Sequence, residues 1–180
     1  MTSTVISQAE FSTDKNNTHR YTLKKVWNQE GEIAVVIMLN PTKKADAIRF
    51  DKSVMLMNNY FAEQINNNNE QLFGGFIVIN LFSYRSATLA ELKNIKLKNR
   101  SDVNTDKWIE EAIKNSNGYV YIAWGSNNNR KTRVKKVVEY LKKYKITEVY
   151  KLKKHNNKHV HPSRYPGKLE FIKILVKNII

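Results

Sequence analysis

Polar side chains stand at the ends of apolar segments in four places along this chain of 180 residues. Asn40 ends the run AVVIMLNP, and Asn80 lies inside GFIVINLFSYR. Ser126 follows GYVYIAWG, and His161 lies in the loop HVHPSRYPG. The first three runs predict buried strands, because they are rich in β-branched and aromatic residues and stop abruptly. Ligands of open parallel sheets bind just beyond the carboxyl ends of the strands, so these four side chains are expected to share one crevice.

The two asparagines could recognise a nucleobase, because a side-chain amide both donates and accepts hydrogen bonds. Asn80 lies between Ile79 and Leu81, and an unpaired amide buried there would cost about 1–3 kcal/mol. Its partner could be the edge of a base or the protein's own backbone. Asn40, which is followed by Pro41, is also typical of an ordinary turn.

The third and fourth segments indicate anion binding and base stacking. Ser126, Arg130 and Lys131 lie at the start of a predicted helix, whose N-terminus would attract a phosphate, although Ser126 could also be no more than a helix cap. His161 is titratable near neutral pH, but a lone histidine is more often an ordinary surface or core residue. Tyr165, four residues further on, is a candidate for stacking on a base or wedging between base steps.

The charge of the chain is concentrated in its second half. The formal net charge is +15. Residues 1–90 hold 9 Lys/Arg against 8 Asp/Glu, whereas residues 91–180 hold 22 against 8. A one-sided basic field favours a polyanionic partner, and DNA or another nucleic acid is the commonest one. The alternative is a highly soluble surface in a Lys/Asn-rich proteome. The predicted DNA face is the basic helix that carries Arg130, Lys131 and Arg133.

Composition excludes several kinds of site. The chain has no cysteine, so disulfides, thiolate zinc sites and a cysteine nucleophile are excluded. Three of the four histidines lie in one basic loop, and we expect neither a metal site nor an organic cofactor. No apolar stretch is long enough to span a membrane. The start MTSTVISQAE lacks the pattern of a secretion signal, so a cytoplasmic location is expected.

The periodicity of apolar residues predicts a single α/β domain over residues 19–180, preceded by a flexible segment, 1–18. Residues 20–27 alternate as an edge strand would. Strands alternate with helices, which favours a three-layer α/β/α sandwich around a central, mainly parallel sheet of four to five strands. The strands of that sheet are predicted at 34–39, 76–82, 119–124 and 146–152. Helices are predicted at 52–65, from Thr88, from Ser101 or Asp102 to about Lys114, at about 130–144, and at 168–178.

Taken together and in this order, the four segments resemble the uracil-DNA glycosylase superfamily. GFIVINLFSYR is similar to its second strand, YIAWGSNNNRK to its "LWG" strand, and HPSRY to its "HPSPL" loop. VVIMLNP is similar to the first motif of the mismatch-specific branch, where classical members have Asp-Pro. The chain resembles still more closely a bacterial family known only as a domain of unknown function, numbered 1643. The motifs that carry this second resemblance are MLNPTKKADA, Asp51-Lys52-Ser53, VINLFSYR, AWGS and HVHPSRY.

The resemblance implies a uracil-DNA glycosylase-like fold and a DNA-binding enzyme that flips out uracil or another abnormal base and hydrolyses its N-glycosidic bond. Asn40 would position the attacking water, Asn80 would bind the Watson–Crick edge of the base, and His161 would hydrogen-bond the base carbonyl as negative charge develops. Phe50 is a candidate for stacking on the base. In the intercalating loop, Ser163 would contact a backbone phosphate, Arg164 stands where the family has proline, and Tyr165 would replace the family's intercalating leucine.

Two other functions compete with this hypothesis. Asn40 cannot act as a general base as an aspartate can, so the chain could be an inactive nucleic-acid-binding module of the same fold. A nucleotide- or RNA-processing enzyme with its phosphate site at Gly125–Lys131 is the third reading, which the lack of a Walker-type loop disfavours.

Overall fold

The computed structural model describes residues 4–125, 130–155 and 161–179 and contains a seven-stranded mixed sheet. Its strand order is β1-β2-β4-β3-β5-β6-β7. The four strands β4, β3, β5 and β6 are parallel, and antiparallel strands flank them on both sides. The strands are β1 (Ile6–Phe11), β2 (Arg20–Val26), β3 (Glu32–Met38), β4 (Phe73–Asn80), β5 (Val120–Ile122), β6 (Glu148–Leu152) and β7 (Phe171–Leu175).

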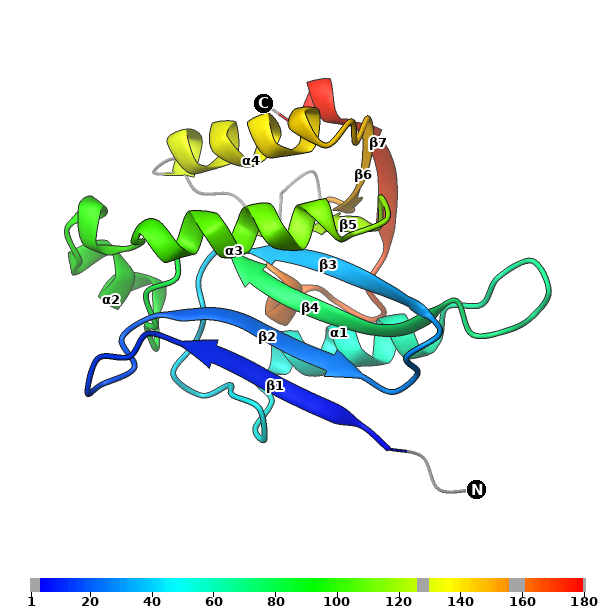
Figure 1. The fold of residues 1–180 in the computed structure, drawn as a ribbon, viewed down its shortest axis with the longest axis horizontal. Helices are drawn as coiled ribbons and strands as arrows, with labels where there is room; N and C mark the ends of the chain where they lie inside the picture. Colours follow the sequence, from blue (N-terminus) through cyan, green and yellow to red (C-terminus); the bar gives the residue numbers. More distant parts are fainter. Residues whose placement is uncertain (1–3, 126–129, 156–160, 180) are drawn as a thin grey trace.

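Helices pack against both faces of the sheet, and Figure 1 shows α3 and α4 on one face and α1 on the other. Apolar stripes explain the two layers: Ile109 of α3 and Val137 of α4 join one core, and Met57 and Phe61 of α1 join the second. The helices are α1 (Lys52–Ala62), α2 (Leu89–Asn94), α3 (Val103–Lys114) and α4 (Lys131–Lys143). No helix among the described residues is both long and apolar enough to cross a membrane.

The predicted α/β class is confirmed, and each of the four predicted strands forms part of the parallel region. Thr88 and Asp102 cap α2 and α3 as predicted. The sheet is larger and more mixed than the predicted four to five strands. Its two helical layers are also unequal, so the description as a three-layer sandwich is too regular.

Three predictions about the ends of the sheet were wrong. Residues 6–11, expected in a flexible segment, form β1 and pair with β2, which is therefore not an edge strand. Residues 171–175, expected in a helix, form β7 on the free edge of β6. Each of the two added strands closes an edge whose backbone N–H and C=O groups would otherwise lack partners in the sheet.

The carboxyl ends of β3 and β4 and the start of α1 lie at the same edge of the sheet. Met38 and Asn80 are directly paired at the last position of the two strands. Side chains alternate along β4, so Asn80 faces the α1 side together with Phe76 and Val78. Asp51, the residue that caps α1, is therefore placed near this edge.

Candidate functional site at the carboxyl edge of the parallel strands

The side chain of Asn80 is buried at this edge, and its hydrogen-bonding groups lack partners among the described residues. It is 3% exposed. Within the described part of the chain neither Nδ2 nor Oδ1 has a hydrogen-bond partner. Native proteins pair nearly all buried polar groups, so an amide with both ends open needs a specific explanation. Its donor and acceptor are available to a ligand that offers the complementary pair.

His161 precedes a short 3-10 turn, Pro162–Arg164, which contacts α1. Its Nδ1 accepts a hydrogen bond from the backbone N–H of Ser163 at 3.4 Å and lies 3.0 Å from the Ser163 hydroxyl. A ring nitrogen that accepts from a backbone N–H carries no proton, so the neutral ring has its proton on Nε2. Burial lowers the pKa of His161, the charge of Asp51 raises it in opposition, and that of Arg164 lowers it further. At neutral pH, His161 is therefore an uncharged donor.

Asp51 connects the elements around His161. Its Oδ1 accepts from the backbone N–H of Val54 at 2.9 Å, and its Oδ2 accepts from the Thr42 hydroxyl at 2.8 Å. Its negative charge is close enough to raise the pKa of both His161 and Arg20. In the sequence, Asp51 stood out only as part of the motif Asp51-Lys52-Ser53, with no predicted place in the site. Its position could have indicated a place in the site, because Asp51 caps the helix that follows the loop containing Asn40.

Arg20 was not predicted as a site residue. It is 2% exposed, and its Nη1 donates to the carbonyl oxygen of Ala45 at 2.8 Å. Burial lowers its pKa to about 10, while Asp51 acts in the opposite direction. The guanidinium is therefore still charged at neutral pH. The alternating segment that contains Arg20 gave no sign of this burial.

Asn40 is half-buried and serves its own loop. Its Nδ2 donates to the Ser86 hydroxyl at 2.8 Å and to the carbonyl oxygen of Pro41 at 3.2 Å. The same Pro41 oxygen accepts from the backbone N–H of Ser86 at 3.1 Å. The two bonds that involve Ser86 hold the loop after β3 against the loop after β4. Asn40 and Pro41 lie in irregular backbone and the turn comes at residues 43–44, so the turn predicted at Asn40 and Pro41 is displaced along the chain.

The predicted DNA-contacting residues fall into different environments. Arg133 is largely buried, with Nε donating to Leu81 O at 2.7 Å and Nη1 paired with Asp106 at 2.6 Å. We therefore correct its assignment: Arg133 binds α4 to the end of β4 and to α3. Lys131 and Arg164 are exposed, and Arg130 is half-buried, which lowers its pKa. Ser126 lies outside the described residues.

Two predicted aromatic residues differ in exposure. Tyr165 is 8% exposed and packs in the core on the α1 side of the sheet. A side chain enclosed in this way is not presented to DNA, so its assignment as the intercalating residue is also corrected. Phe50 is partly exposed, and the Lys25 ammonium lies 4.0 Å from the centre of its ring. Its predicted stacking on a base stays a prediction, as does the phosphate contact of Ser163.

A family model described as "Protein of unknown function (DUF1643)" matches residues 20–163. The chain belongs to this family. No curated protein and no solved structure matches the chain. The DUF1643 match begins at Arg20 and ends two residues beyond His161, so it contains every residue of the site at the carboxyl edge. Strands β1 and β7 lie outside it.

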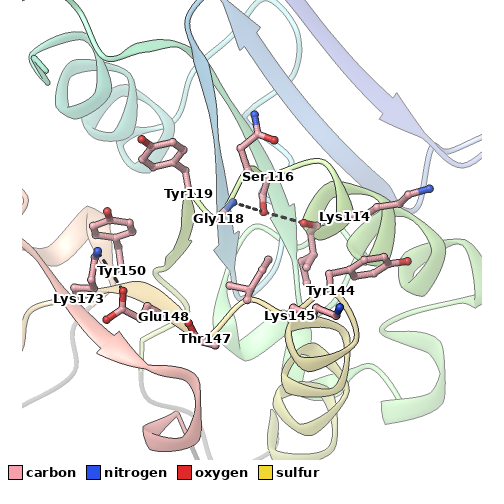
Figure 2. Close-up of a pocket in the computed structure, with 13 residues that line it drawn as sticks. Lys114, Ser116, Gly118, Tyr119, Tyr144, Lys145, Thr147, Glu148, Tyr150 and Lys173 are labelled. Carbon is pink, nitrogen blue, oxygen red and sulfur yellow. Dashed lines mark hydrogen bonds and ion pairs between the residues drawn. The ribbon is translucent and has the colours of Figure 1, made fainter.

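A hollow of the DUF1643 chain, about 530 Å³ in volume, lies at the amino ends of β5 and β6. Figure 2 shows Tyr119, Tyr144 and Tyr150 around it, with Lys114 and Lys173 at its rim. Parallel strands place this end opposite to Asn80. The residues predicted for the site are absent from its lining. The hollow and the candidate site are therefore separate.

The lowered pKa of His161 predicts that the stability of the protein depends on pH. In the folded protein its pKa lies below its ordinary value of 6.5, so protonation favours the unfolded state. Stability should be constant above pH 6.5 and fall as the pH drops through the lowered pKa, because a proton on Nδ1 breaks the bond from Ser163. Urea unfolding between pH 5 and 8 measures this. His161→Gln should flatten the acid limb, and an unchanged limb would assign it to another group.

Proposed function

We propose that this protein binds nucleic acid and takes one unstacked base into the site at the carboxyl edge of β3, β4 and β5. The observation that carries the proposal is the buried Asn80 amide, whose donor and acceptor both lack partners among the described residues. A nucleobase edge offers an adjacent acceptor and donor, which an asparagine side chain can pair in two hydrogen bonds. The resemblance to uracil-DNA glycosylases and the net charge of +15 support the same partner.

The activity that we propose is hydrolysis of the N-glycosidic bond of that base. As the bond breaks, negative charge develops on the leaving base, and a positioned donor beside it contributes roughly 3 kcal/mol of transition-state stabilisation. The Nε2–H of neutral His161 is such a donor, since Ser163 occupies Nδ1. The carboxylate of Asp51, which already interacts with His161 through its charge, would stabilise the cationic sugar electrostatically.

A second candidate, base binding without chemistry, is favoured by the hydrogen bonds of Asn40. The predicted role of Asn40 is to position water, yet its Nδ2 is engaged by Ser86 and Pro41. An amide also cannot accept a proton from water as a carboxylate can. In this case the protein would hold an unstacked base without cleaving it.

One assay separates the two candidates. Labelled oligonucleotides that contain uracil, mismatched or modified bases are incubated with the protein, and abasic sites are cleaved with alkali. Excision of one class of base, slowed by His161→Ala with little loss of affinity, is the result expected for the glycosylase. Tight binding with unstacking of a 2-aminopurine probe and no cleavage would select the binding module. Absence of both binding and cleavage would overturn the proposal.

Duplex DNA requires a wedge, and we predict that Ile48 provides it. Ile48 is 90% exposed on a turn in which Asp46 Oδ1 accepts from the backbone N–H groups of Ile48 and Arg49 at 2.9 and 2.8 Å. An apolar side chain on a rigid turn beside a basic residue can enter between base steps, which costs a few kcal/mol of stacking. Ile48→Ala should lower the single-turnover rate or affinity on duplex about tenfold and leave single strands unaffected.

The matched control is Ile65→Ala, since Ile65 is also exposed but lies in the connection between α1 and β4, at the opposite end of the strands. It should behave as the unaltered protein on both substrates. Equal losses on duplex and single strands in Ile48→Ala would remove Ile48 from the wedge role.

The exposed lysines of α4 should contribute to the salt dependence of binding. Lys131 and Lys135 are exposed, and no ion pair is recorded for them among the described residues. Replacing both with glutamine should flatten the slope of log affinity against log salt by about 1.8, because each phosphate contact contributes about 0.9. The control replaces Lys153 and Lys168, which lie outside α4 and are paired with Glu170 and Glu63. Equal slopes in the two double variants would exclude α4 as the DNA face.

A further inference from the structure

The charge of Arg20 is buried at the candidate site without an ionic partner in the part of the chain that the structure describes. At 2% exposure, its Nε has no hydrogen-bond partner in the described part of the chain, and Nη1 bonds only a carbonyl oxygen. No ion pair involving Arg20 is recorded among these residues. A buried charge is costly unless it is paired, and a guanidinium has five N–H donors to satisfy. Such a group is suited to an anion that the protein itself does not supply.

The nearby carboxylates are engaged elsewhere. Asp46 Oδ2 accepts from Arg49 Nε at 2.9 Å and Nη2 at 2.6 Å. Asp51 accepts from Thr42 and Val54. Both carboxylates influence the pKa of Arg20 through their charge, but neither forms a recorded hydrogen bond to it. The two carboxylates therefore favour the charged form of Arg20, but neither forms an ion pair with it.

A second arginine adds to the positive charge at this place. Arg85 is near enough to lower the pKa of Arg20. Its Nη1 and Nη2 donate to the carbonyl oxygens of Asn17 and Lys43 at 3.2 and 3.3 Å, and its buried Nε also has no partner in the described chain. The Arg85 guanidinium also lies 4.9 Å from the centre of the Phe11 ring. Within the described chain the two guanidinium groups hydrogen-bond only carbonyl oxygens, and their like charges repel one another. An anion between them would relieve that repulsion.

Arg20 also lies at the same edge of the sheet as Asn80. Its backbone N–H donates to the carbonyl oxygen of Ser83, three residues beyond Asn80, at 2.9 Å. β2 pairs directly with β4. Asp51 influences both Arg20 and His161. The buried amide and the guanidinium thus lie at the same edge of the sheet, and the charge of Asp51 acts on both the guanidinium and the imidazole.

We propose that Arg20, with Arg85 beside it, binds a phosphate group of the ligand whose base pairs with Asn80. This inference rests on the proposed function for the base, while the phosphate contact can be tested independently of it. Planar guanidinium groups match the oxygens of phosphate in two parallel hydrogen bonds. The phosphate could be a backbone phosphodiester of DNA or the terminal phosphate of a free nucleotide.

The test compares ligands with and without the charge, using the full chain. A uracil-containing single-stranded oligonucleotide is made with a neutral methylphosphonate at each linkage in turn, and its affinity is measured beside that of deoxyuridine and deoxyuridine 5′-monophosphate. We expect one linkage near the uracil to cost about tenfold in affinity, and this loss should vanish in Arg20→Met. If the phosphate belongs to a free nucleotide, the unaltered protein should instead bind deoxyuridine 5′-monophosphate about tenfold more tightly than deoxyuridine. Arg20→Met should bind the two with equal affinity.

Arg20→Lys and Arg85→Met serve if Arg20→Met does not fold. The first keeps both charges but loses the planar fork of Arg20, and the second keeps the charge of Arg20 alone, so each should weaken the phosphate-dependent difference. Inorganic phosphate separates this inference from the proposed function. If phosphate raises the Tm of the unaltered protein and of Asn80→Leu but not of Arg20→Met, the anion site stands even where base binding fails. Equal loss for charged and neutral ligands in Arg20→Met, or no effect of any methylphosphonate or of phosphate, would overturn the inference and leave Arg20 a structural residue.

Discussion

Asn80→Leu is expected to stabilise the fold and to abolish recognition of the base. Burying an amide without partners costs about 1–3 kcal/mol, and leucine, of nearly the same size, removes that cost. The free energy of unfolding in urea should therefore rise by about 1–2 kcal/mol. Affinity for an oligonucleotide that carries the recognised base should fall about a hundredfold, since the two hydrogen bonds to the base are lost. Opposite effects on stability and binding are typical of a residue retained for function.

The control for this variant is Asn59→Leu. Asn59 is exposed on α1, so its replacement should change neither affinity nor stability by more than about 0.5 kcal/mol. A loss of stability in Asn80→Leu would mean that the amide is satisfied within the fold. In that case Asn80 is a structural residue, and the base-binding proposal loses its main support.

Gly74→Ala is expected to cost about 3 kcal/mol or more in the free energy of unfolding, among the largest effects of a single methyl group in this protein. A Cβ at Gly74 would lie 1.8 Å from the carbonyl oxygen of Asn28 and 2.9 Å from the Cα of Gly31. Both are backbone atoms and cannot rotate away. The Gly74 oxygen also accepts from the N–H groups of Trp27 and Asn28 at 2.8 and 2.9 Å. Any shift would thus disturb the connection from β2 to β3.

Gly118→Ala is the matched control, because a Cβ there would meet no atom within 4 Å. Gly118 has a φ of +84°, so alanine would cost about 1–2 kcal/mol through backbone conformation alone. Urea midpoints of the two variants at equal m-value measure the difference. A loss in Gly74→Ala no larger than that in Gly118→Ala would show that β4 can move away from the Asn28 turn.

The parallel core of the sheet was predictable because its strands are buried on both faces. Runs such as AVVIM and FIVIN need no partner information to be recognised as strands. The outer strands were not predictable in this way. β7 contains Phe171, Ile172 and Ile174, whose spacing also fits a helix, and its strand conformation depends on the free edge of β6. β1 is half-exposed and is held by its pairing with β2.

The candidate site was predictable only where a single residue carried the signal. Asn80 stood out as a polar residue in an apolar run, and its burial is confirmed. Arg20 and Arg133 depended on distant partners that a sequence does not reveal. Arg20 is buried because the loop at Ala45 covers it, and Arg133 turns inward because Asp106 lies on the neighbouring helix. Tyr165 was misassigned because a motif position does not show whether its side chain packs inward.

The central claim, that Asn80 pairs with a base, can be tested on the amide itself by NMR. The two side-chain N–H signals of Asn80 are assigned by their absence in Asn80→Leu and followed during titration with a uracil-containing single-stranded oligonucleotide. We predict that one of the two signals, that of the proton donated to the base, moves downfield and becomes protected from exchange with water, in step with binding. If backbone signals of α4 respond to the oligonucleotide while the Asn80 side-chain signals stay unchanged at saturation, nucleic acid binds elsewhere and the claim is contradicted.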